Sequence, residues 1–430
     1  MESISKEPRM RHMLFTSAAV GLLLAVVTAG AVGQAPTPPA NWPRFLGPNG
    51  RAVVQGVTFP ATWTDADYVW KGTLKGGGHS SPVVWGNRVF ITSGNQKTAA
   101  RHIQCFKADD GAALWTKTYA GSPCRQNSLN AYAVTTPALD AERLYLSWAT
   151  PERYVVVALT HAGEEVWRRD LGPWKSQHGY GGSPMVVGDT VILTNDQLGP
   201  SSIVALDGAT GAIRWKTPRP TKDKSAYAVP CLFRSSTGSR HLVVISKAAG
   251  VAGLDPATGR VLWQAADTMP QRVVSSPTLA GDLVLGTCGT GGRGKHLIAI
   301  RPPASDGGKA EVAWTVTKDA PYVPTSIFYD GWVLLWSDKG VVSCVEAATG
   351  ERIWSQRVGG GTYYASPILV GDKVYNTSTT GEMVVLKAGK VFEELGRNDL
   401  GEKCQATPAV AGGRMFIRTW SRLMALAAEE

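Results

Sequence analysis

The 430-residue sequence is poor in cysteine and in charge, with six cysteines and 18% Asp, Glu, Lys and Arg. It contains no Cys-x-x-Cys or His-x-x-x-His pattern, so we expect no structural metal site. No stretch has the periodicity of a sizeable helix. The 48 glycines and 26 prolines instead separate apolar, strand-like runs, which favours an all-β chain over a disordered one.

Long runs of like charge are also missing. Lysine and arginine outnumber aspartate and glutamate by 44 to 34, which gives a net charge of +10. This excess favours contact with anionic surfaces. The basic residues are nevertheless scattered through the sequence, so we expect no nucleic-acid partner.

A small residue followed by proline and an apolar strand recurs eight times, with successive prolines 41 to 55 residues apart. A period of this length is typical of architectures that repeat one four-stranded unit. The sequence therefore predicts an all-β fold, an eight-bladed β-propeller of antiparallel blades over residues 42–430. The phrases are Ser81-Pro82, Thr136-Pro137, Ser183-Pro184, Val229-Pro230, Ser276-Pro277, Val323-Pro324, Ser366-Pro367 and Thr407-Pro408.

Tryptophan recurs in the fourth strand of these repeats, after a glycine-containing turn. A large ring at one repeated position can fill the wedge between neighbouring blades. The seventh repeat lacks this tryptophan, and we expect Phe392 or Leu395 to replace it in a looser joint. The predicted docking residues are Trp70, Trp115, Trp167, Trp215, Trp263, Trp314 and Trp354.

The eighth repeat contributes only three strands, around residues 410, 415–417 and 423–426. Residues 68–71 precede the first repeat and carry the ending that the eighth repeat lacks. We therefore expect this N-terminal strand to join the last blade, which closes the ring and leaves few exposed edges.

The N-terminus has the pattern of a targeting segment. Two arginines precede a weakly apolar run over residues 14–32 that ends in small residues. This pattern predicts a signal peptide over residues 1–33, followed by an extended linker over residues 34–41. An uncleaved anchor, which would associate the protein with a membrane, is the alternative. In either case we expect a periplasmic or secreted propeller, without a lipid on an N-terminal cysteine because none precedes Cys105.

Export would permit disulfide bonds. The cysteines in the third strands of two repeats are expected to be buried small side chains. Two pairings stay open from the sequence, Cys124 with Cys404 and Cys231 with Cys288, because loop length leaves their geometry undetermined.

Residues 289–295 have the spacing of a phosphate-binding loop, but His296 follows where that motif needs serine or threonine. The next residues have a strand pattern, so no helix N-terminus would meet a phosphate. We interpret the segment as a hairpin loop between two strands.

Residues 205–215 resemble the tryptophan-docking repeat of pyrroloquinoline quinone (PQQ) enzymes and their relatives, Ala-x-Asp-x-x-Thr-Gly-x-x-x-Trp. Residues 254–263 repeat the pattern with Gly253 in the first position. The resemblance extends over nearly the whole predicted propeller and implies its fold, but the motif residues tie turns and lock blades rather than carry chemistry. Residues 42–50 are also similar to the opening of uncharacterised secreted propellers of this superfamily.

The resemblance implies two possible functions. The dehydrogenases of the superfamily hold PQQ and calcium in the central funnel, beside carboxylates and typically under a disulfide of adjacent cysteines, a pair that this sequence lacks. The propeller subunit of the outer-membrane β-barrel assembly machinery is instead a scaffold without a cofactor. We expect a monomeric, non-catalytic scaffold of the cell envelope that needs no PQQ, calcium or other metal and binds an envelope protein or peptide. The alternative is a PQQ-dependent dehydrogenase of sugars or alcohols.

Loops entering the innermost strands should meet around the axis on one face, where propellers usually bind ligands. Aromatic and imidazole side chains recur there, just ahead of the repeated prolines. They either plug the channel through hydrogen bonds or form a platform for a ligand or peptide. Asn195 and Asp196 in a facing loop would add polar contacts or, with Asp338, bind calcium. The other candidates are His79, Tyr132, His178, Tyr180, Tyr227, Arg272, Tyr322, Tyr363 and Tyr364.

Overall fold

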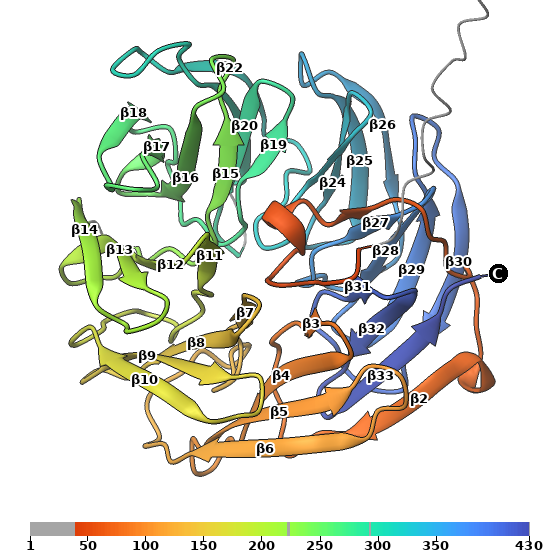
Figure 1. The fold of residues 1–430 in the computed structure, drawn as a ribbon. Helices are drawn as coiled ribbons and strands as arrows, with labels where there is room; N and C mark the ends of the chain where they lie inside the picture. The colour runs from red at the N-terminus through yellow and green to blue at the C-terminus, as the bar shows by residue number, and fades with distance from the viewer. Residues whose placement is uncertain (1–38, 222–223, 292–293, 430) are drawn as a thin grey trace, which may run out of the picture. The chain divides into compact units, whose positions relative to one another are not determined.

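A computed structural model describes the protein over residues 39–221, 224–291 and 294–429. These residues form a ring of eight antiparallel blades, so the predicted propeller is confirmed (Figure 1). The predicted signal peptide, and the predicted linker except residues 39–41, lie outside the described residues. Within the described ranges, no helix combines the length and apolar character needed to cross a membrane.

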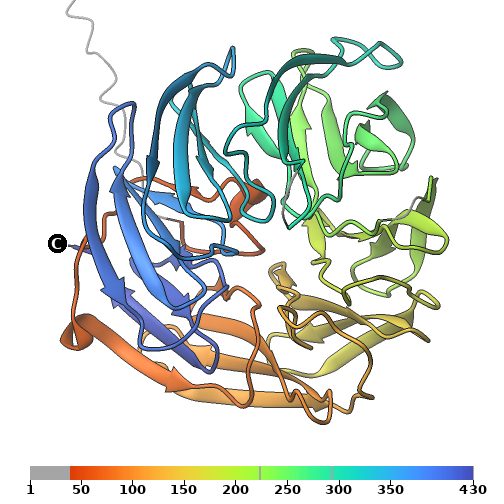
Figure 2. The same cartoon turned by 180° about the vertical axis from the view of Figure 1, so that it is seen from behind.

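Each blade runs from a short inner strand near the axis to an outer strand at the rim (Figures 1 and 2). The first four blades contain β3 (Val83–Trp85), β4 (Arg88–Gly94), β5 (Arg101–Lys107) and β6 (Ala113–Tyr119); β7 (Ala138–Leu139), β8 (Arg143–Ala149), β9 (Tyr154–Thr160) and β10 (Glu165–Asp170); β11 (Met185–Val187), β12 (Thr190–Asn195), β13 (Ser201–Asp207) and β14 (Ile213–Arg219); and β15 (Cys231–Arg234), β16 (Arg240–Ser246), β17 (Gly250–Leu254) and β18 (Val261–Ala265). The last four contain β19 (Thr278–Ala280), β20 (Leu283–Cys288), β21 (His296–Arg301) and β22 (Glu311–Val316); β23 (Ile327–Tyr329), β24 (Trp332–Trp336), β25 (Val341–Glu346) and β26 (Arg352–Arg357); β27 (Ile368–Val370), β28 (Lys373–Thr377), β29 (Glu382–Lys387) and β30 (Glu394–Asp399); and β31 (Ala409–Ala411), β32 (Arg414–Arg418) and β33 (Arg422–Ala427) with β2 (Tyr68–Thr73). The short 3-10 helices η1 (Pro48–Gly50) and η2 (Asp65–Asp67) and strand β1 (Val53–Val54) precede the first blade.

The middle strands are apolar because blades cover them on both faces. In blade three, β12 is buried along its whole length, whereas the outer strand β14 alternates, from Arg214 on, between exposed residues and residues that are buried or half-buried. Continuous apolar runs therefore mark middle strands, and alternating patterns mark the rim. β20, which ends at Cys288, pairs antiparallel with β21, which begins at His296, and this confirms that the sequence between them joins two strands of a hairpin.

The N-terminal strand closes the ring, as predicted. β2 pairs antiparallel with β33, with Trp70 opposite Ala425, and supplies the fourth strand of blade eight. A second N-terminal strand, β1, pairs in parallel with β27 and adds a fifth strand to blade seven. The N-terminal region thus ties two blades from the other end of the chain.

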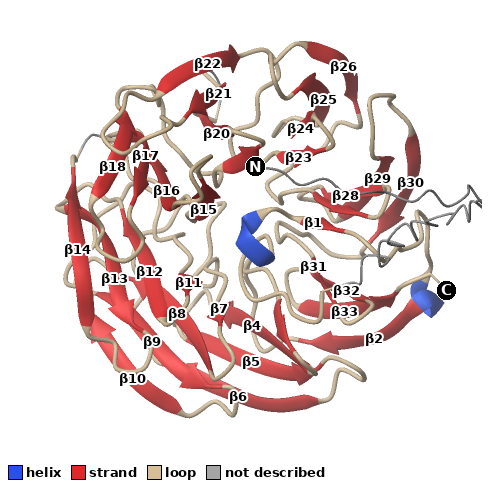
Figure 3. Ribbon diagram, turned by 45° about the horizontal axis from the view of Figure 1, so that its top comes forward, coloured by secondary structure: helices blue, strands red, loops and turns tan. Residues whose placement is uncertain are grey.

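Residues 41–54, which we call the plug, cross the axis of the ring. Trp42 forms a β-bridge with blade one, and the Pro43 carbonyl accepts a hydrogen bond from blade two. The Asn49 side chain bonds both backbone groups of Leu232 in blade four, each at 2.9 Å. Because β1 then joins blade seven, the plug contacts inner strands on several sides of the channel, and Figure 3 shows η1 near the centre of the ring.

Tryptophans of the outer strands dock on the next blade at six joints. Each indole N–H donates to a backbone carbonyl in a turn of the neighbouring blade, at 2.8–3.2 Å. In the third blade, Gly211 adopts a φ of +71°, and a Cβ there would lie 2.6 Å from the Trp167 ring. The turn therefore needs glycine for both its conformation and its close approach. The six residues are Trp70, Trp115, Trp167, Trp215, Trp314 and Trp354.

Trp263 behaves differently from the other predicted docking residues. Its indole N–H donates to His241 Nδ1 within its own blade, at 3.0 Å. A Cβ on Gly253 would lie 2.3 Å from Trp263 Nε1, so glycine in place of the usual alanine lets the ring turn inward. Blade five also lacks the Thr-Gly turn that receives tryptophan in blades three, four and six.

The joint after blade seven corrects a prediction. Gly396, opposite Val385, occupies the position of the docking tryptophan, so neither Phe392 nor Leu395 replaces it. A Cβ on Gly396 would lie 2.5 Å from Thr62 Cγ2, which shows that the N-terminal segment fills the wedge. Phe392 instead packs against Trp354 of blade six, with ring centroids 5.3 Å apart.

All six cysteines are free thiols. Neither pairing that the sequence left open is therefore present. Cys105 and Cys344 are buried as expected, and burial raises the pKa of each thiol to about 12.

Candidate functional site

The residues ahead of the inner strands form a ring of hydroxyl groups around the axis. At seven of its steps, a serine or threonine hydroxyl accepts a hydrogen bond from the backbone N–H of the equivalent residue in the preceding blade, at 2.9–3.2 Å. The step from blade three to blade four cannot form because Val229 has no hydroxyl. The ring residues are Ser81, Thr136, Ser183, Val229, Ser276, Thr325, Ser366 and Thr407.

Blade six shifts the repeated phrase. Its ring residue is Thr325, which accepts the hydrogen bond from Ser276. Pro324 therefore precedes the ring residue, whereas proline follows it in the other blades. The Val323-Pro324 phrase is thus not the structural counterpart of the other seven.

All eight ring residues line a cavity of about 520 Å³, which we call the mouth cavity. Phe45 of the plug also lines it. The structure brings six of the predicted site residues to this cavity: His79, His178, Tyr227, Arg272, Tyr322 and Tyr364.

Three other predicted tyrosines lie in the surrounding wall. The Tyr132 hydroxyl bonds both backbone groups of Cys124, at 2.9 and 3.0 Å. The Tyr180 hydroxyl donates to the Tyr154 hydroxyl at 2.6 Å, and Tyr363 is fully buried. These three side chains stabilise the loops by packing and hydrogen bonds rather than by facing a ligand.

Asn195 and Asp196 do not line the mouth cavity either. The Asn195 amide oxygen accepts a hydrogen bond from Gln197 at 2.9 Å. Asp196 forms an ion pair with Arg219 at 2.8 Å, with both side chains 5% exposed. Burial raises the pKa of Asp196, although Arg219 opposes this shift. The Asp196–Arg219 pair is therefore a buried ion pair within the fold and does not face a ligand.

Positive charge exceeds negative charge in the mouth cavity. The described residues of the lining include Arg272, Lys295 and Lys339 but one carboxylate, Asp338. Asp338 already accepts hydrogen bonds from Lys295, at 2.7 Å, and from two backbone N–H groups of the neighbouring loop. The Arg272 guanidinium donates to the side chains of Gln177 and Tyr322 and has no carboxylate partner among the described residues.

The two histidines of the mouth cavity are neutral at neutral pH. Burial lowers the pKa of His79 to about 3, and the charges of Arg418 and Lys403 add to this effect. Burial and the charge of Arg272 also lower the pKa of His178. The His79 ring packs against Trp420, with centroids 5.1 Å apart, so it contributes aromatic surface rather than charge.

Metal ligands do not gather in this region. In the described part of the chain, no three His, Cys, Asp or Glu side chains lie close enough together to hold one ion. The Asp338 carboxylate, considered above for calcium with Asn195 and Asp196, lies apart from both in the mouth cavity.

Reasoning from the sequence missed several parts of the cavity. Six of the eight phrases begin with serine or threonine, which was the available signal for the hydroxyl ring. Lys295 ends the glycine-rich loop 289–295, which drew attention only as a nucleotide motif. The sequence did not indicate that Phe45 lines the cavity, because its position depends on the path of the plug.

Comparison with known proteins now places the chain in a family. A sequence profile for the PQQ-repeat family described as outer membrane protein assembly factor BamB matches residues 48–147 and, in overlapping matches, 152–303, 228–335, 306–390 and 338–430. The chain belongs to this PQQ-like propeller family. A search of curated proteins gave no match.

Solved structures share the fold of this chain at low identity. BamB from Moraxella catarrhalis is 12% identical, with a TM-score of 0.60 over 84% of this chain and 97% of the other. A quinohemoprotein alcohol dehydrogenase from Comamonas testosteroni is 14% identical, with a TM-score of 0.62 over 90% and 80%. Sqt1 from Saccharomyces cerevisiae is 10% identical, with a TM-score of 0.59 over 87% and 100%. At these identities the likeness establishes the fold alone.

Proposed function

We propose that this PQQ-like propeller is a non-catalytic scaffold of the cell envelope that binds an extended, acidic segment of a partner protein in its mouth cavity. The observation that carries the proposal is that the hydrogen bonds of the Asp338 carboxylate are already made within the protein. Among the described residues of the lining, the one carboxylate is already bonded to Lys295 and to two backbone groups. The cavity therefore offers unneutralised positive charge and aromatic surface, which suit acidic and apolar side chains.

The envelope location rests on the predicted signal peptide over residues 1–33. The scaffold role is consistent with the family description, which names an assembly factor. A cavity of about 520 Å³ has the size of a site for several side chains. Tyr227, Tyr322 and Tyr364 would supply contact area, and Arg272 and Lys339 would attract carboxylates.

A PQQ-dependent dehydrogenase is the second candidate, favoured by the fold shared with such enzymes. PQQ carries three carboxylates, and its calcium needs several converging oxygen ligands. Arg272 would serve as one clamp for a carboxylate of PQQ. The single carboxylate that the described residues bring to the lining already bonds Lys295, and the sequence has no adjacent cysteines to cover the cofactor. The residues present therefore do not fit the pair of PQQ and calcium.

A pull-down with charge-reversal variants tests the scaffold proposal. The full chain is used as bait for an envelope extract, beside Lys339→Glu and Tyr364→Ala in the mouth cavity and Lys216→Glu on the outer strand β14. We expect the same partner to be retained by the unchanged protein and by Lys216→Glu, and lost at least in large part with the two mouth variants. Equal retention by all four proteins, or no specific partner with any of them, would contradict the proposal.

A further inference from the structure

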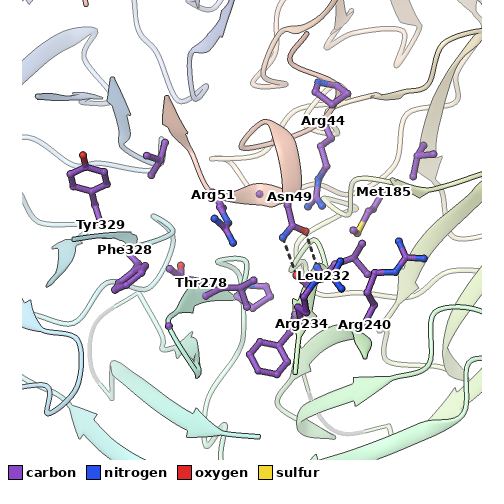
Figure 4. Close-up of a pocket in the computed structure, with 18 of the residues that line it drawn as sticks. Arg44, Asn49, Arg51, Met185, Leu232, Arg234, Arg240, Thr278, Phe328 and Tyr329 are labelled. Carbon is purple, nitrogen blue, oxygen red and sulfur yellow. Dashed lines mark hydrogen bonds between the residues drawn. The ribbon is translucent and has the colours of Figure 1, made fainter. Parts of the chain in front are cut away.

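A second cavity lies at the other end of the inner strands. It has a volume of about 750 Å³, within the usual range for small-molecule sites. The plug forms one side, and the inner hairpins of blades three to six form the other (Figure 4). We call it the plug-face cavity. It shares no lining residue with the mouth cavity. Two consecutive residues of the plug face different cavities: Arg44 lines the plug-face cavity, and Phe45 lines the mouth cavity.

Four arginines line the plug-face cavity: Arg44 and Arg51 from the plug, and Arg234 and Arg240 from the β15–β16 hairpin. Asp330 is the one acidic residue among the described residues of this lining. None of the four guanidinium groups has a carboxylate partner among the described residues. The cavity therefore carries a local excess of positive charge.

Arg44 is the most unusual of the four. Its side chain is 4% exposed, and its Nη2 donates to the Pro230 carbonyl at 2.7 Å. Its Nε and Nη1 have no hydrogen-bond partner in the described structure. Burial lowers its pKa to about 10, so the group is still charged at neutral pH. A buried guanidinium with two unsatisfied nitrogens and no carboxylate partner is unfavourable, and an anion in the adjacent cavity would relieve that cost.

The hairpin supplies a second, independent observation. Arg234 and Arg240 lie directly opposite each other in the antiparallel pair of β15 and β16. Like charges at such a position destabilise a sheet. Their placement beside the cavity is explained if a bound anion compensates both charges.

The remaining walls are mainly apolar and include Met185, Leu232, Leu279 and Phe328. Guanidinium groups bind phosphate oxygens with paired hydrogen bonds, and several of them match the double charge of a phosphate monoester. We propose that the plug-face cavity binds an organic phosphate, with the phosphate group at the arginines and an apolar body against these walls. The phosphate belongs either to a free small molecule or to the headgroup of an anionic lipid.

Calorimetric titration of the full chain with phenyl phosphate tests the proposal. We expect saturable binding that is tighter than that of inorganic phosphate, since only phenyl phosphate also meets the apolar walls. Arg240→Gln removes one exposed guanidinium without disturbing the core and should weaken binding at least about tenfold. The matched control Arg125→Gln lies outside the cavity and should bind like the unchanged protein. Arg44→Met should also weaken binding, with its fold checked by circular dichroism.

Vesicles distinguish the two sources of the phosphate. Sedimentation with phosphatidylglycerol–phosphatidylcholine vesicles, and with phosphatidylcholine alone, is compared for the unchanged protein and the same variants. Binding to the anionic vesicles that needs Arg240 supports a lipid headgroup, and binding of phenyl phosphate alone supports a free ligand. The proposal is overturned if neither probe binds, or if Arg240→Gln and Arg125→Gln have equal effects. Because Lys339→Glu alters only the mouth cavity, it separates failure here from failure of the proposed scaffold role.

Discussion

The two ends of the channel differ in how their charges are compensated. At the mouth, Asp338 neutralises Lys295, and the ring hydroxyls bond backbone groups of neighbouring blades. At the plug face, Arg44 keeps two unpartnered nitrogens and Arg234 faces Arg240 across the hairpin. The same inner strands thus end in a largely satisfied polar ring on one side and in an unbalanced cluster on the other.

This difference indicates two kinds of ligand. A lining whose polar groups already bond each other has few free donors to coordinate a compact cofactor, and it contributes mainly shape, aromatic surface and overall charge. Such a surface suits a partner protein. A cluster of unpaired guanidinium groups beside apolar walls is instead suited to one small anion. The plug lies between the mouth cavity and the plug-face cavity.

The largest expected effect on stability comes from deleting the N-terminal segment that contains the plug. Truncation through residue 71 deletes the plug and four of the six residues of β2, which leaves most of the β33 edge unpaired and opens one cavity into the other. We expect aggregation or loss of cooperative melting, measured by circular dichroism and size-exclusion chromatography. Truncation before residue 39 is the control and should melt like the full chain. A protein without residues 1–71 that melts normally would rule out closure by the N-terminal segment.

Two tryptophan variants test whether the plug contributes to phosphate binding as well as to stability, with Trp42 in the plug and Trp215 between two blades. Trp215→Ala opens a hole between blades, and Trp42→Ala opens one beneath Gly47 of the plug, where a Cβ would lie 2.7 Å from the indole ring. Each should cost roughly 3 to 5 kcal/mol of unfolding free energy in chemical denaturation. Only Trp42→Ala should also weaken phenyl phosphate binding. A loss below about 1 kcal/mol for Trp215→Ala would mean that its ring is not packed as described.

The buried histidine at the mouth gives a smaller, pH-dependent effect. His79 has a folded-state pKa of about 3, below the value of about 6.5 expected for an unfolded chain. Below about pH 6.5 the unfolded chain therefore binds a proton that the folded protein excludes, so stability is full above this pH and falls toward pH 3. His79→Gln should flatten the dependence of unfolding free energy on pH between about 6 and 4, by up to roughly 1.4 kcal/mol per pH unit. An unchanged slope in urea titrations would show that the imidazole is solvated.

The smallest effect sharpens the contrast at the plug face. Arg240→Gln removes the like-charge pair and should raise the unfolding free energy of the ligand-free protein by about 0.2 to 1 kcal/mol. Arg125→Gln should leave it unchanged. A variant that gains stability while losing phosphate binding fits a functional cluster, whereas destabilisation by Arg240→Gln would mean that the arginine is needed by the fold itself.

The repeated parts of the molecule could be predicted because the same pattern occurs in several repeats, so that each copy supports the interpretation of the others. The ring closure and the docking of Trp167 or Trp215 follow from one pattern seen many times. The prediction was wrong at Gly396, where Thr62 takes the place of an indole, because that contact joins segments with no shared pattern. Trp263 turns inward for a local reason, the missing side chain of Gly253.

The site was harder to predict than the fold. Positions ahead of the prolines could be found from the period of the repeat, which brought His178, Tyr227 and Arg272 together. The same rule could not separate them from Tyr180 or Tyr363, since loop side chains turn inward or outward without periodicity. The arginines of the plug-face cavity gave no sequence signal, because the path of the plug alone brings Arg44 next to Pro230.

The contrast between the two ends is tested most directly by calorimetric titration of the full chain with PQQ and calcium. Because the one carboxylate in the described part of the mouth lining is already bonded, we predict no binding tighter than about 1 μM and no heat that depends on calcium. Stoichiometric, calcium-dependent binding with submicromolar affinity, lost in Arg272→Gln, would contradict the scaffold proposal and place the protein among the dehydrogenases.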